Sequence, residues 1–362
     1  MSRKIRVGIL YGGRSGEHEV SVSSARSLIA AIDRQKFDVI PIGISRQGKW
    51  LLGTDPAQLE NSRVPESAGH DNQLVVDVSS QGLVQAGHIP GESGGLVDVV
   101  FPLLHGPFGE DGTVQGMLEM AGVPYIGADV LPSAVGMDKG IMKALFEHAG
   151  LPGPRYRIFV ARAWTESKGD VIATIENEIG LPVFVKPSRL GSSVGITRAA
   201  TTDELWSSVT EAFAHDTKII VEEEIRGREI ECGVLGNHDP TISVFGEIVS
   251  KHEFYDYEAK YTVGLADLVI PARLNAGHVS TLTDIALRAF AAIDACGMAR
   301  VDFFIEGESN RVILNEINTI PGFAPTSMFP KLWAASGLSY GELFERLVEL
   351  AFERHEETRN RG

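Results

Sequence analysis

The amino-terminal segment carries the pattern that most constrains the fold: an apolar strand, an amphipathic helix and a second apolar strand in close succession. Ile5–Leu10 is an apolar run that ends at Gly12–Gly13, which predicts a strand followed by a tight turn. From Ser21 onward apolar residues recur at helical spacing, and one face of this helix would hold Val22, Ala25, Leu28, Ile29 and Ile32. Phe37–Ile44 predicts the next strand. Strands that alternate with helices build parallel sheets, so we expect an open α/β domain.

Two further strands, Val97–Leu104 and Val123–Ile126, would extend this first domain, which we expect to cover residues 1–128 with a helix over Thr113–Met120. A central domain over residues 129–225 would begin with a helix that Gly150 and Pro152 terminate. Its predicted helices are Asp138–Ala149, Glu166–Ile179 and Thr202–Ala214, with Thr202 as an N-cap. Its predicted strands are Tyr156–Ala161, Leu181–Lys186 and Lys218–Ile225.

The remaining residues, 226–362, predict a third domain that mixes strands and helices. The expected strands are Glu229–Leu235, Ile242–Ile248, Ala299–Glu306 and Arg311–Asn318, and the expected helices are Gly277–Ala295 and Tyr340–Arg354. Residues 250–270 show no clear period and are rich in Tyr, Lys and acidic residues. A loop of that length inside a compact domain is usually functional, so we expect a mobile functional loop there.

Charge and cysteine content narrow the classes of function. Acidic residues outnumber basic ones 48 to 33, a formal charge of −15, which disfavours nucleic acid as the main partner because phosphate backbones require clustered cations. There are only two cysteines, Cys232 and Cys296, and they have no metal-type spacing, which argues against a disulfide framework and is typical of a reducing cytosol. No apolar run reaches the length of about 18 residues that a membrane span needs. We therefore expect a cytoplasmic protein without a membrane partner.

The segment RVDFFIEGESNRVILNEINTIPG is the most informative about chemistry, because two alternating runs flank the turn-forming Gly307–Asn310 and predict a hairpin. Glu316 and Asn318 lie two apart and share a face. A five-residue loop would place Asp302 opposite Glu316, whereas a four-residue loop would place it on the other face. Three converging oxygen donors would suit Mg²⁺. Spacing alone favours the plainer interpretation, in which these residues are the solvated face of a half-buried hairpin, because alternation already predicts a polar face.

Three other segments admit a functional and a plain interpretation. In FVKPSRLGSSVGIT, Lys186 ends an apolar strand before a Gly- and Ser-rich loop that could cover phosphates, although the order is not that of a P-loop and a surface hairpin would look similar. In YGGRSGEHEVS, Glu17 could receive a substrate ammonium group, but helix capping is the simpler explanation of the turn alone. In LLHGPFGEDGTVQG, His105 follows a buried strand, where α/β sheets place substrate sites or simply a satisfied histidine.

Taken together, these segments resemble the D-alanine–D-alanine ligase family of the ATP-grasp superfamily. The resemblance covers nearly the whole chain, with the motifs in the right order: GGRSGEHEVS, LHGPFGEDGTVQG, GMDK, VKPSRLGSSVGI, VEEEIRGREIECGVLG, FYDYEAKY, GMARVDFF and NEINTIPGF. It implies three domains, with ATP held between the antiparallel sheets of the central and last domains. Leu190 departs from the pattern, since many relatives have Glu at that position of the Gly- and Ser-rich loop.

The resemblance also implies a nucleotide and metal site. Lys139 and Lys186 would contact the ATP phosphates. The residues expected to line the adenosine pocket are Glu222, Glu223, Glu224, Ile225 and Glu229. The backbone of Glu223–Ile225 would contact the adenine, and Glu229 would contact the ribose. Two Mg²⁺ ions, which Mn²⁺ could replace, would bind Asp302, Glu316 and Asn318, with Glu316 as the bridging ligand.

The reaction implied is the ATP-dependent joining of two D-alanine molecules through an acyl phosphate, for peptidoglycan synthesis, and the family suggests a homodimer. Glu17 would bind the first ammonium group and His105 would lie beside its carboxylate. The oxyanion would be stabilised by Arg300 and the Gly322 N–H, and the remaining expected substrate and closure residues are Ser192, Lys260, Tyr261 and Ser327. Relatives that make D-alanyl–D-lactate lack the tyrosine at position 261, so the resemblance favours a dipeptide, with another ATP-grasp ligase as the alternative.

Overall fold

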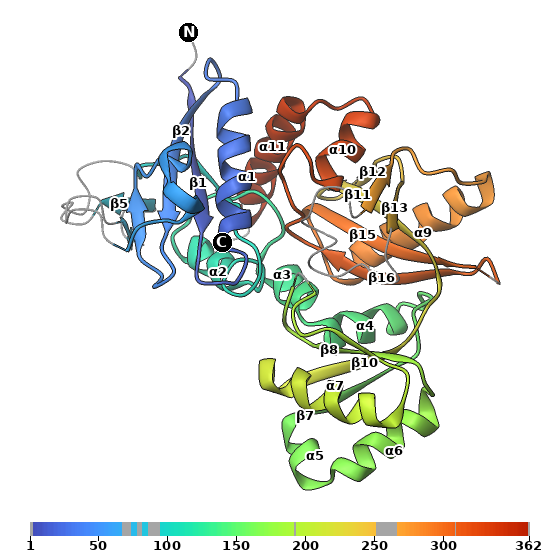
Figure 1. Ribbon diagram of the computed structural model, residues 1–362. Coiled ribbons are helices and arrows are strands. Elements are labelled where there is room, and N and C mark those ends of the chain that lie inside the picture. Colours follow the sequence, from blue (N-terminus) through green and yellow to red (C-terminus); the bar gives the residue numbers. More distant parts are fainter. Residues whose placement is uncertain are drawn as a thin grey trace.

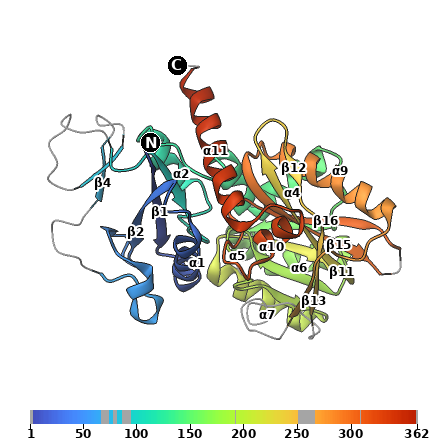
Figure 2. The same cartoon turned by 90° about the horizontal axis from the view of Figure 1, so that it is seen from above.

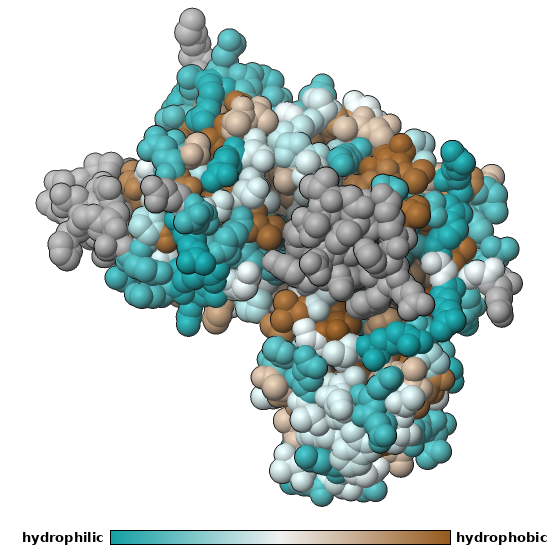
Figure 3. All heavy atoms as spheres, viewed as in Figure 1, coloured by the Kyte–Doolittle hydropathy of each residue, from teal (hydrophilic) through white to brown (hydrophobic). Residues whose placement is uncertain are grey.

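The computed structural model describes residues 3–66, 74–77, 82–85, 95–191, 193–250, 266–307 and 309–360. Figure 1 shows three groups of elements: one around β1, one around β8 and β10, and one around β15 and β16. In the described part of the chain no helix is both long and apolar enough to cross a membrane. The face drawn in Figure 3 is mostly hydrophilic or neutral, and its hydrophobic residues gather in small groups.

The first sheet has the strand order β3-β2-β1-β6, and β1 runs parallel to both of its neighbours, as the sequence predicts. β3 adds an antiparallel edge that we did not predict. The elements of this part are β1 (Ile5–Gly12), α1 (His18–Ala31), β2 (Phe37–Ile44), β3 (Trp50–Leu52), two short 3₁₀ helices (Pro56–Gln58, Glu60–Ser62), β4 (Leu74–Asp77), β5 (Gly82–Gln85), β6 (Val99–Pro102) and α2 (Thr113–Met120). α1 covers one face, as its apolar stripe requires.

Helix α11 (Tyr340–Arg359), from the end of the chain, packs beside α1, as both views in Figures 1 and 2 show. Phe344 and Leu347 of α11 are buried in the same apolar cluster as Val22 and Leu28 of α1. α11 begins with a complete capping box between Ser339 and Glu342. The carboxyl-terminal helix therefore completes the core of the amino-terminal sheet.

The second sheet is antiparallel, with the order β7-β10-β8-β9. Its elements are α3 (Val130–Met137), α4 (Lys139–His148), β7 (Tyr156–Val160), α5 (Ala161–Glu166), α6 (Lys168–Glu178), β8 (Val183–Pro187), β9 (Thr197–Ala199), α7 (Thr202–His215) and β10 (Lys218–Glu223). The side chain of Asp138 caps α4 by accepting a hydrogen bond from the Ile141 N–H.

The third sheet is also antiparallel along its main path, β14-β13-β11-β15-β16. Its elements are β11 (Gly227–Gly236), β12 (Thr241–Ile242), β13 (Gly246–Ser250), β14 (Ala266–Val269), α9 (Ala276–Ala292), β15 (Gly297–Glu306), β16 (Val312–Asn318) and α10 (Met328–Ala335). α9 packs on this sheet through Leu282, Ile285 and Phe290. A small two-stranded sheet pairs β4 with β5. The combination of a mainly parallel first sheet with two larger antiparallel sheets confirms the predicted fold class.

Several predicted elements differ from the structure. Val123–Ile126 forms only an isolated bridge, between Val100 and Tyr125. The helix predicted over Glu166–Ile179 starts after Ser167, and a separate short helix precedes it. The N-cap of α7 is Thr201, whose hydroxyl accepts from the Glu204 N–H, so Thr202 is the first helical residue.

Two further differences concern strand length and missed helices. The strand predicted over Ile242–Ile248 is split, because residues 243–245 lie between β12 and β13. α3 and α10 were not predicted, and each contains a proline in its first turn, Pro132 and Pro330, a position where proline costs no hydrogen bond.

Candidate active site

The β15–β16 hairpin places Asp302 and Glu316 side by side through a bulge. Ile305 lies opposite Val312, and this register continues as far as Phe303 opposite Leu314. Continued further, it would put Asp302 opposite Asn315. A register shift between Asp302 and Phe303 instead pairs Asp302 with Glu316. The extra residue of the bulge therefore brings both carboxylates to one face, although the turn has the register of a four-residue loop.

Arg300 organises the carboxylate side of this site. Its Nε donates to Asp302 Oδ1 at 2.7 Å and its Nη2 to Asp302 Oδ2 at 2.6 Å, a bidentate pair. The same Nε lies 3.1 Å from Glu231 Oε2 on the neighbouring strand β11. Arg300 is only 8% exposed, and burial opposes its charge. The attraction of Asp302 and Glu231 outweighs that burial and raises the Arg300 pKa well above its ordinary value.

The donor set of the hairpin fits a hard cation. Within the described ranges there is no group of three or more His, Cys, Asp and Glu side chains that could hold a metal ion. Asp302 and Glu316 supply two carboxylates, and Asn318 would supply the third donor as an amide oxygen. Asn318 Nδ2 now donates to Asp302 Oδ2 at 3.0 Å and Glu316 Oε1 at 3.5 Å. A half-turn of that amide would place its oxygen there, giving the all-oxygen set that Mg²⁺ prefers.

Facing this hairpin, the central sheet carries a buried ion network. Lys186 Nζ on β8 lies 2.6 Å from Glu222 Oε2, and Lys143 Nζ on α4 lies 3.1 Å from Glu222 Oε1. Burial opposes all three charges. The attraction of both lysines outweighs it for Glu222, whose pKa is lowered, and the attraction of Glu222 raises the Lys186 pKa. For Lys143, burial prevails and lowers the pKa.

Sequence reasoning missed Lys143. The available signal was its position on the apolar side of a predicted helix, next to Met142 and three residues before Phe146, both of which are buried. A lysine on such a face is almost never fully buried unless it is paired.

A cleft lies between the two antiparallel sheets. A cavity of about 150 Å³ is lined by residues of both sheets, including Lys186, Glu222, Ile225, Glu229, Arg300, Asp302 and Glu316. A second cavity of about 90 Å³ is lined by Lys139, Leu190 and Asn318 among others, and Glu316 lines it too. Lys139 Nζ donates to the Leu190 carbonyl at 2.7 Å. Because that contact uses the backbone, it does not depend on which side chain occupies position 190.

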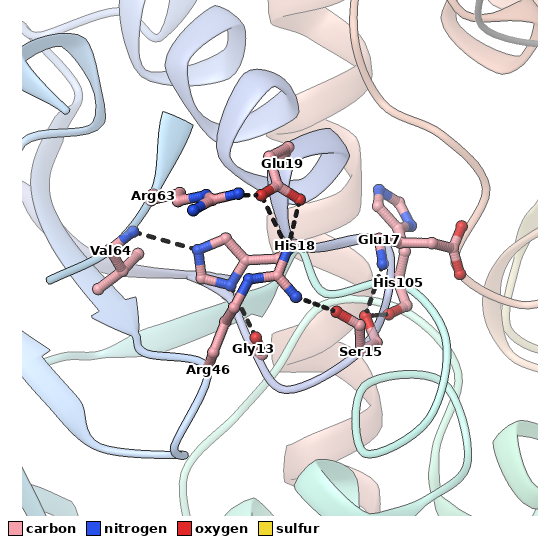
Figure 4. Close-up of polar contacts among 9 residues, drawn as sticks. All are labelled: Gly13, Ser15, Glu17, His18, Glu19, Arg46, Arg63, Val64 and His105. Atoms are coloured by element: carbon pink, nitrogen blue, oxygen red, sulfur yellow. Dashed lines mark hydrogen bonds and ion pairs between the residues drawn. The ribbon is translucent and has the colours of Figure 1, made fainter. Parts of the chain in front are cut away.

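The turn before α1 directs Glu17 away from the helix, as Figure 4 shows. Glu17 stands at the N-cap, yet no N–H of the described helix donates to its carboxylate, so the capping explanation is wrong. Ser15 fixes the turn: its hydroxyl donates to the His105 carbonyl at 2.6 Å and accepts from the Glu17 N–H at 3.2 Å. A Cβ on Gly191 would lie 3.2 Å from Glu17 Oε2, so the Gly- and Ser-rich loop adjoins this carboxylate.

His18 stabilises the same turn from behind, as Figure 4 also shows. Its Nδ1 lies 2.7 Å from the Gly13 carbonyl, and its Nε2 lies 3.1 Å from the Val64 N–H. A carbonyl only accepts and an N–H only donates, so these partners assign the proton to Nδ1. His105, the neighbour of Glu17, is also buried, at 5% exposure.

The other predicted residues fall into three groups. Gly322 and Ser327 adjoin, because a Cβ on Gly322 would lie 3.1 Å from Ser327 Oγ. The side chains of Glu223 and Glu224 pair with arginines, Arg155 at 2.7 Å and Arg198 at 2.6 Å. Their backbone N–H groups donate to the carbonyls of Arg155 and Pro182. Ser192, Lys260, Tyr261 and most of the predicted loop 250–270 lie outside the described residues.

Known proteins resemble this chain over nearly its whole length. The chain matches the model for the D-ala D-ala ligase N-terminus over residues 6–128 and that for the C-terminus over residues 145–349. The D-alanine--D-alanine ligase of Bacillus licheniformis is 49% identical over 360 residues, covering 98% of both chains. That of Geobacillus thermodenitrificans is 49% identical over 362 residues, covering 98% of this chain and 97% of the relative.

Solved structures give the same result. The D-alanine-D-alanine ligase from Coxiella burnetii is 34% identical with a TM-score of 0.84, covering 99% of this chain and 97% of its own. The VanG D-Ala:D-Ser ligase from Enterococcus faecalis is 37% identical with a TM-score of 0.84, covering 96% and 100%. These neighbours confirm the ATP-grasp architecture. The chain belongs to the D-alanine–D-alanine ligase family.

Proposed function

We propose that this protein joins two D-alanine molecules into D-alanyl-D-alanine with the consumption of ATP, a step in peptidoglycan precursor synthesis. The observation that carries the proposal is the cleft that Asp302 and Glu316 of one hairpin line together with Lys186 of the opposite sheet. In this reaction the carboxylate of the first D-alanine attacks the γ-phosphate of ATP, and ADP leaves. The amine of the second D-alanine then attacks the acyl phosphate, and inorganic phosphate leaves through a tetrahedral intermediate.

The nucleotide would occupy the cleft between the two antiparallel sheets. Lys186 and Lys139 would bind its phosphates, since each is a cation that lines one of the two adjoining cavities. Glu229 would bind the ribose, and Ile225 would pack against the adenine. The backbone of Glu223–Ile225 would hydrogen-bond the base.

Asp302, Glu316 and Asn318 would hold two Mg²⁺ ions, for which Mn²⁺ can substitute. When bound, the metal neutralises phosphate charge and polarises the γ-phosphate towards attack. Glu316 is suited to bridge the ions because it lines both cavities. Arg300 holds Asp302 in place and would stabilise the oxyanion of the tetrahedral intermediate together with the Gly322 N–H.

The first D-alanine would lie between Glu17 and His105, with its ammonium group on the Glu17 carboxylate. Ser192 and Tyr261 would close over it by hydrogen-bonding with Glu17, and Lys260 and Ser327 would hold the second D-alanine. Closure matters because water would hydrolyse the acyl phosphate. From family membership alone we also propose a cytoplasmic homodimer. We propose domains over 1–128, 129–225 and 226–362, because each range holds one of the larger sheets.

One incubation tests the proposal. The protein is given Mg-ATP with D-alanine alone, or D-alanine with D-serine, D-lactate or an L-amino acid, and the products are identified by mass spectrometry. We expect D-alanyl-D-alanine and ADP from D-alanine alone. Product formation that requires D-serine or D-lactate would replace the proposed dipeptide with a mixed product, and D-serine is included because one solved neighbour is a D-Ala:D-Ser ligase.

A further inference from the structure

Lys143 lies between the two sheets of the cleft and contacts both. Helix α4 packs against β10 and against β16, and Figure 1 shows it between them. The Lys143 ammonium lies 3.1 Å from Glu222 Oε1 on β10 and donates to the Asn315 carbonyl on β16 at 2.8 Å. The residue is 5% exposed. A lysine this deeply buried needs both contacts to compensate for lost hydration.

Asn315 is the extra residue of the bulge that places Glu316. In the described part of the structure β16 is an edge strand, so its outer backbone groups need partners other than a strand. The chain around α4 supplies them. Leu314 N–H donates to the Pro152 carbonyl at 2.7 Å, Ile317 N–H to Met142 Sδ at 3.5 Å, and the Asn315 carbonyl accepts from Lys143.

The contact with Glu222 alone does not account for Lys143. Glu222 already has Lys186 at 2.6 Å, so one positive charge faces it without Lys143. The Asn315 carbonyl, by contrast, is a half-buried acceptor on the bulged residue, and Lys143 donates to it at 2.8 Å. Without its donor, the bulge would lose a contact that holds it, and the register of the turn, which pairs Asp302 with Asn315 and turns Glu316 to the other face, would be less strongly disfavoured.

We propose that Lys143 is a positioning residue that holds the β16 bulge and thereby fixes Glu316 for cation binding. The inference rests on the proposed role of Asp302, Glu316 and Asn318 as metal ligands. Residues that orient metal ligands from behind typically change metal affinity 10–100-fold when removed. Lys143 would thus act on the metal site without touching the metal.

The test measures Mn²⁺ binding by electron paramagnetic resonance with saturating ADP, and ADP affinity without metal separately. Lys143→Met removes the donor with little change in shape, and Lys36→Met, which breaks the exposed pair with Glu345, is the matched control. We expect Mn²⁺ affinity to fall at least tenfold in Lys143→Met and less than twofold in the control. Backbone amide exchange at Asn315–Ile317 in metal-free protein should speed up in Lys143→Met only.

A double variant separates positioning from charge balance. If Lys143 served only Glu222, adding Glu222→Gln would abolish the effect of Lys143→Met on Mn²⁺ affinity; we expect the loss to persist. If Lys143→Met fails to fold, the Lys143→Met/Glu222→Gln double variant is compared with Glu222→Gln instead. A folded variant that binds Mn²⁺ within twofold of wild type, with unchanged exchange, overturns the inference. Wild-type protein that binds no Mn²⁺ would instead refute the proposed metal site, and the inference with it.

Discussion

Replacement of Arg300 by lysine should separate the chemistry of the site from its folding. Arg300→Lys keeps a positive charge beside Asp302 and Glu231, so the buried carboxylates stay balanced. A single ammonium, however, cannot reproduce the two parallel bonds of 2.7 and 2.6 Å to Asp302. Losing one charge-assisted hydrogen bond costs about 1.5–3 kcal/mol, so we expect a folded but less stable protein.

The free-energy cost of this substitution in catalysis should be larger than its cost in stability. Removing one well-placed oxyanion donor costs about 2.7–4 kcal/mol, or 10²–10³ in kcat. We expect a fall of that size in kcat for ADP release, with KM for ATP changed less than threefold, because the group acts mainly in the transition state. A coupled assay for ADP, run at saturating D-alanine, measures both constants.

The neighbouring strand offers a matched control. Arg228 on β11 makes an equally bidentate pair with Glu247, at 2.7 Å for both bonds, in the same sheet. Arg228→Lys should lose less stability, because the Arg228 side chain is 37% exposed and water screens its pair, and should keep kcat within twofold. The reasoning is refuted if Arg300→Lys retains kcat within threefold of wild type, or if Arg228→Lys falls as far.

Three further outcomes follow from the same contacts. Glu316→Ala should abolish ADP release and Mn²⁺ binding while circular dichroism stays unchanged; full activity would remove the metal assignment. Glu222→Gln leaves Lys143 and Lys186 buried without their anion, so it should lower the free energy of unfolding by about 3–5 kcal/mol, measured in urea; a loss below 1 kcal/mol would contradict the network. Burial opposes the charge of Asp98, but Arg6, at 2.7 Å, lowers its pKa below 3.8. Because the folded pKa is the lower one, its stabilisation is present above about pH 4 and is lost as pH falls through the folded value. The difference in Tm between wild type and Asp98→Asn should therefore shrink from pH 7 to pH 3, and a constant difference would rule the pair out.

The periodic parts of the sequence predicted the fold well. Ile5–Leu10 and Phe37–Ile44 became paired parallel strands because continuous apolar runs separated by a helix leave few alternatives. Val123–Ile126 has the same apolar character but makes only one bridge. Strand formation there depends on a neighbouring edge, which local sequence does not encode.

The geometry of the site was less predictable than its residues. Alternation around Gly307–Asn310 left two registers open, and the choice between them depends on the bulge at Asn315. Lys143, whose ammonium group donates to the Asn315 carbonyl in that bulge, lies 172 positions earlier in the chain. A contact of that sequence separation leaves no local signal, so spacing alone could not decide whether Asp302 faces Glu316.

Anomalous diffraction from crystals grown with Mn²⁺ and ADP tests the central claim most directly, because it locates the metal independently of activity. We expect anomalous peaks in the cleft at about 2.1 Å, the spacing typical of Mg²⁺-like sites, from oxygens of Asp302, Glu316 and Asn318. We also expect the Asn318 amide turned so that its oxygen faces the ion. The account would be contradicted if the metal were coordinated only by nucleotide phosphates. In that case Asp302 would still accept hydrogen bonds only from Arg300 and from Asn318 Nδ2.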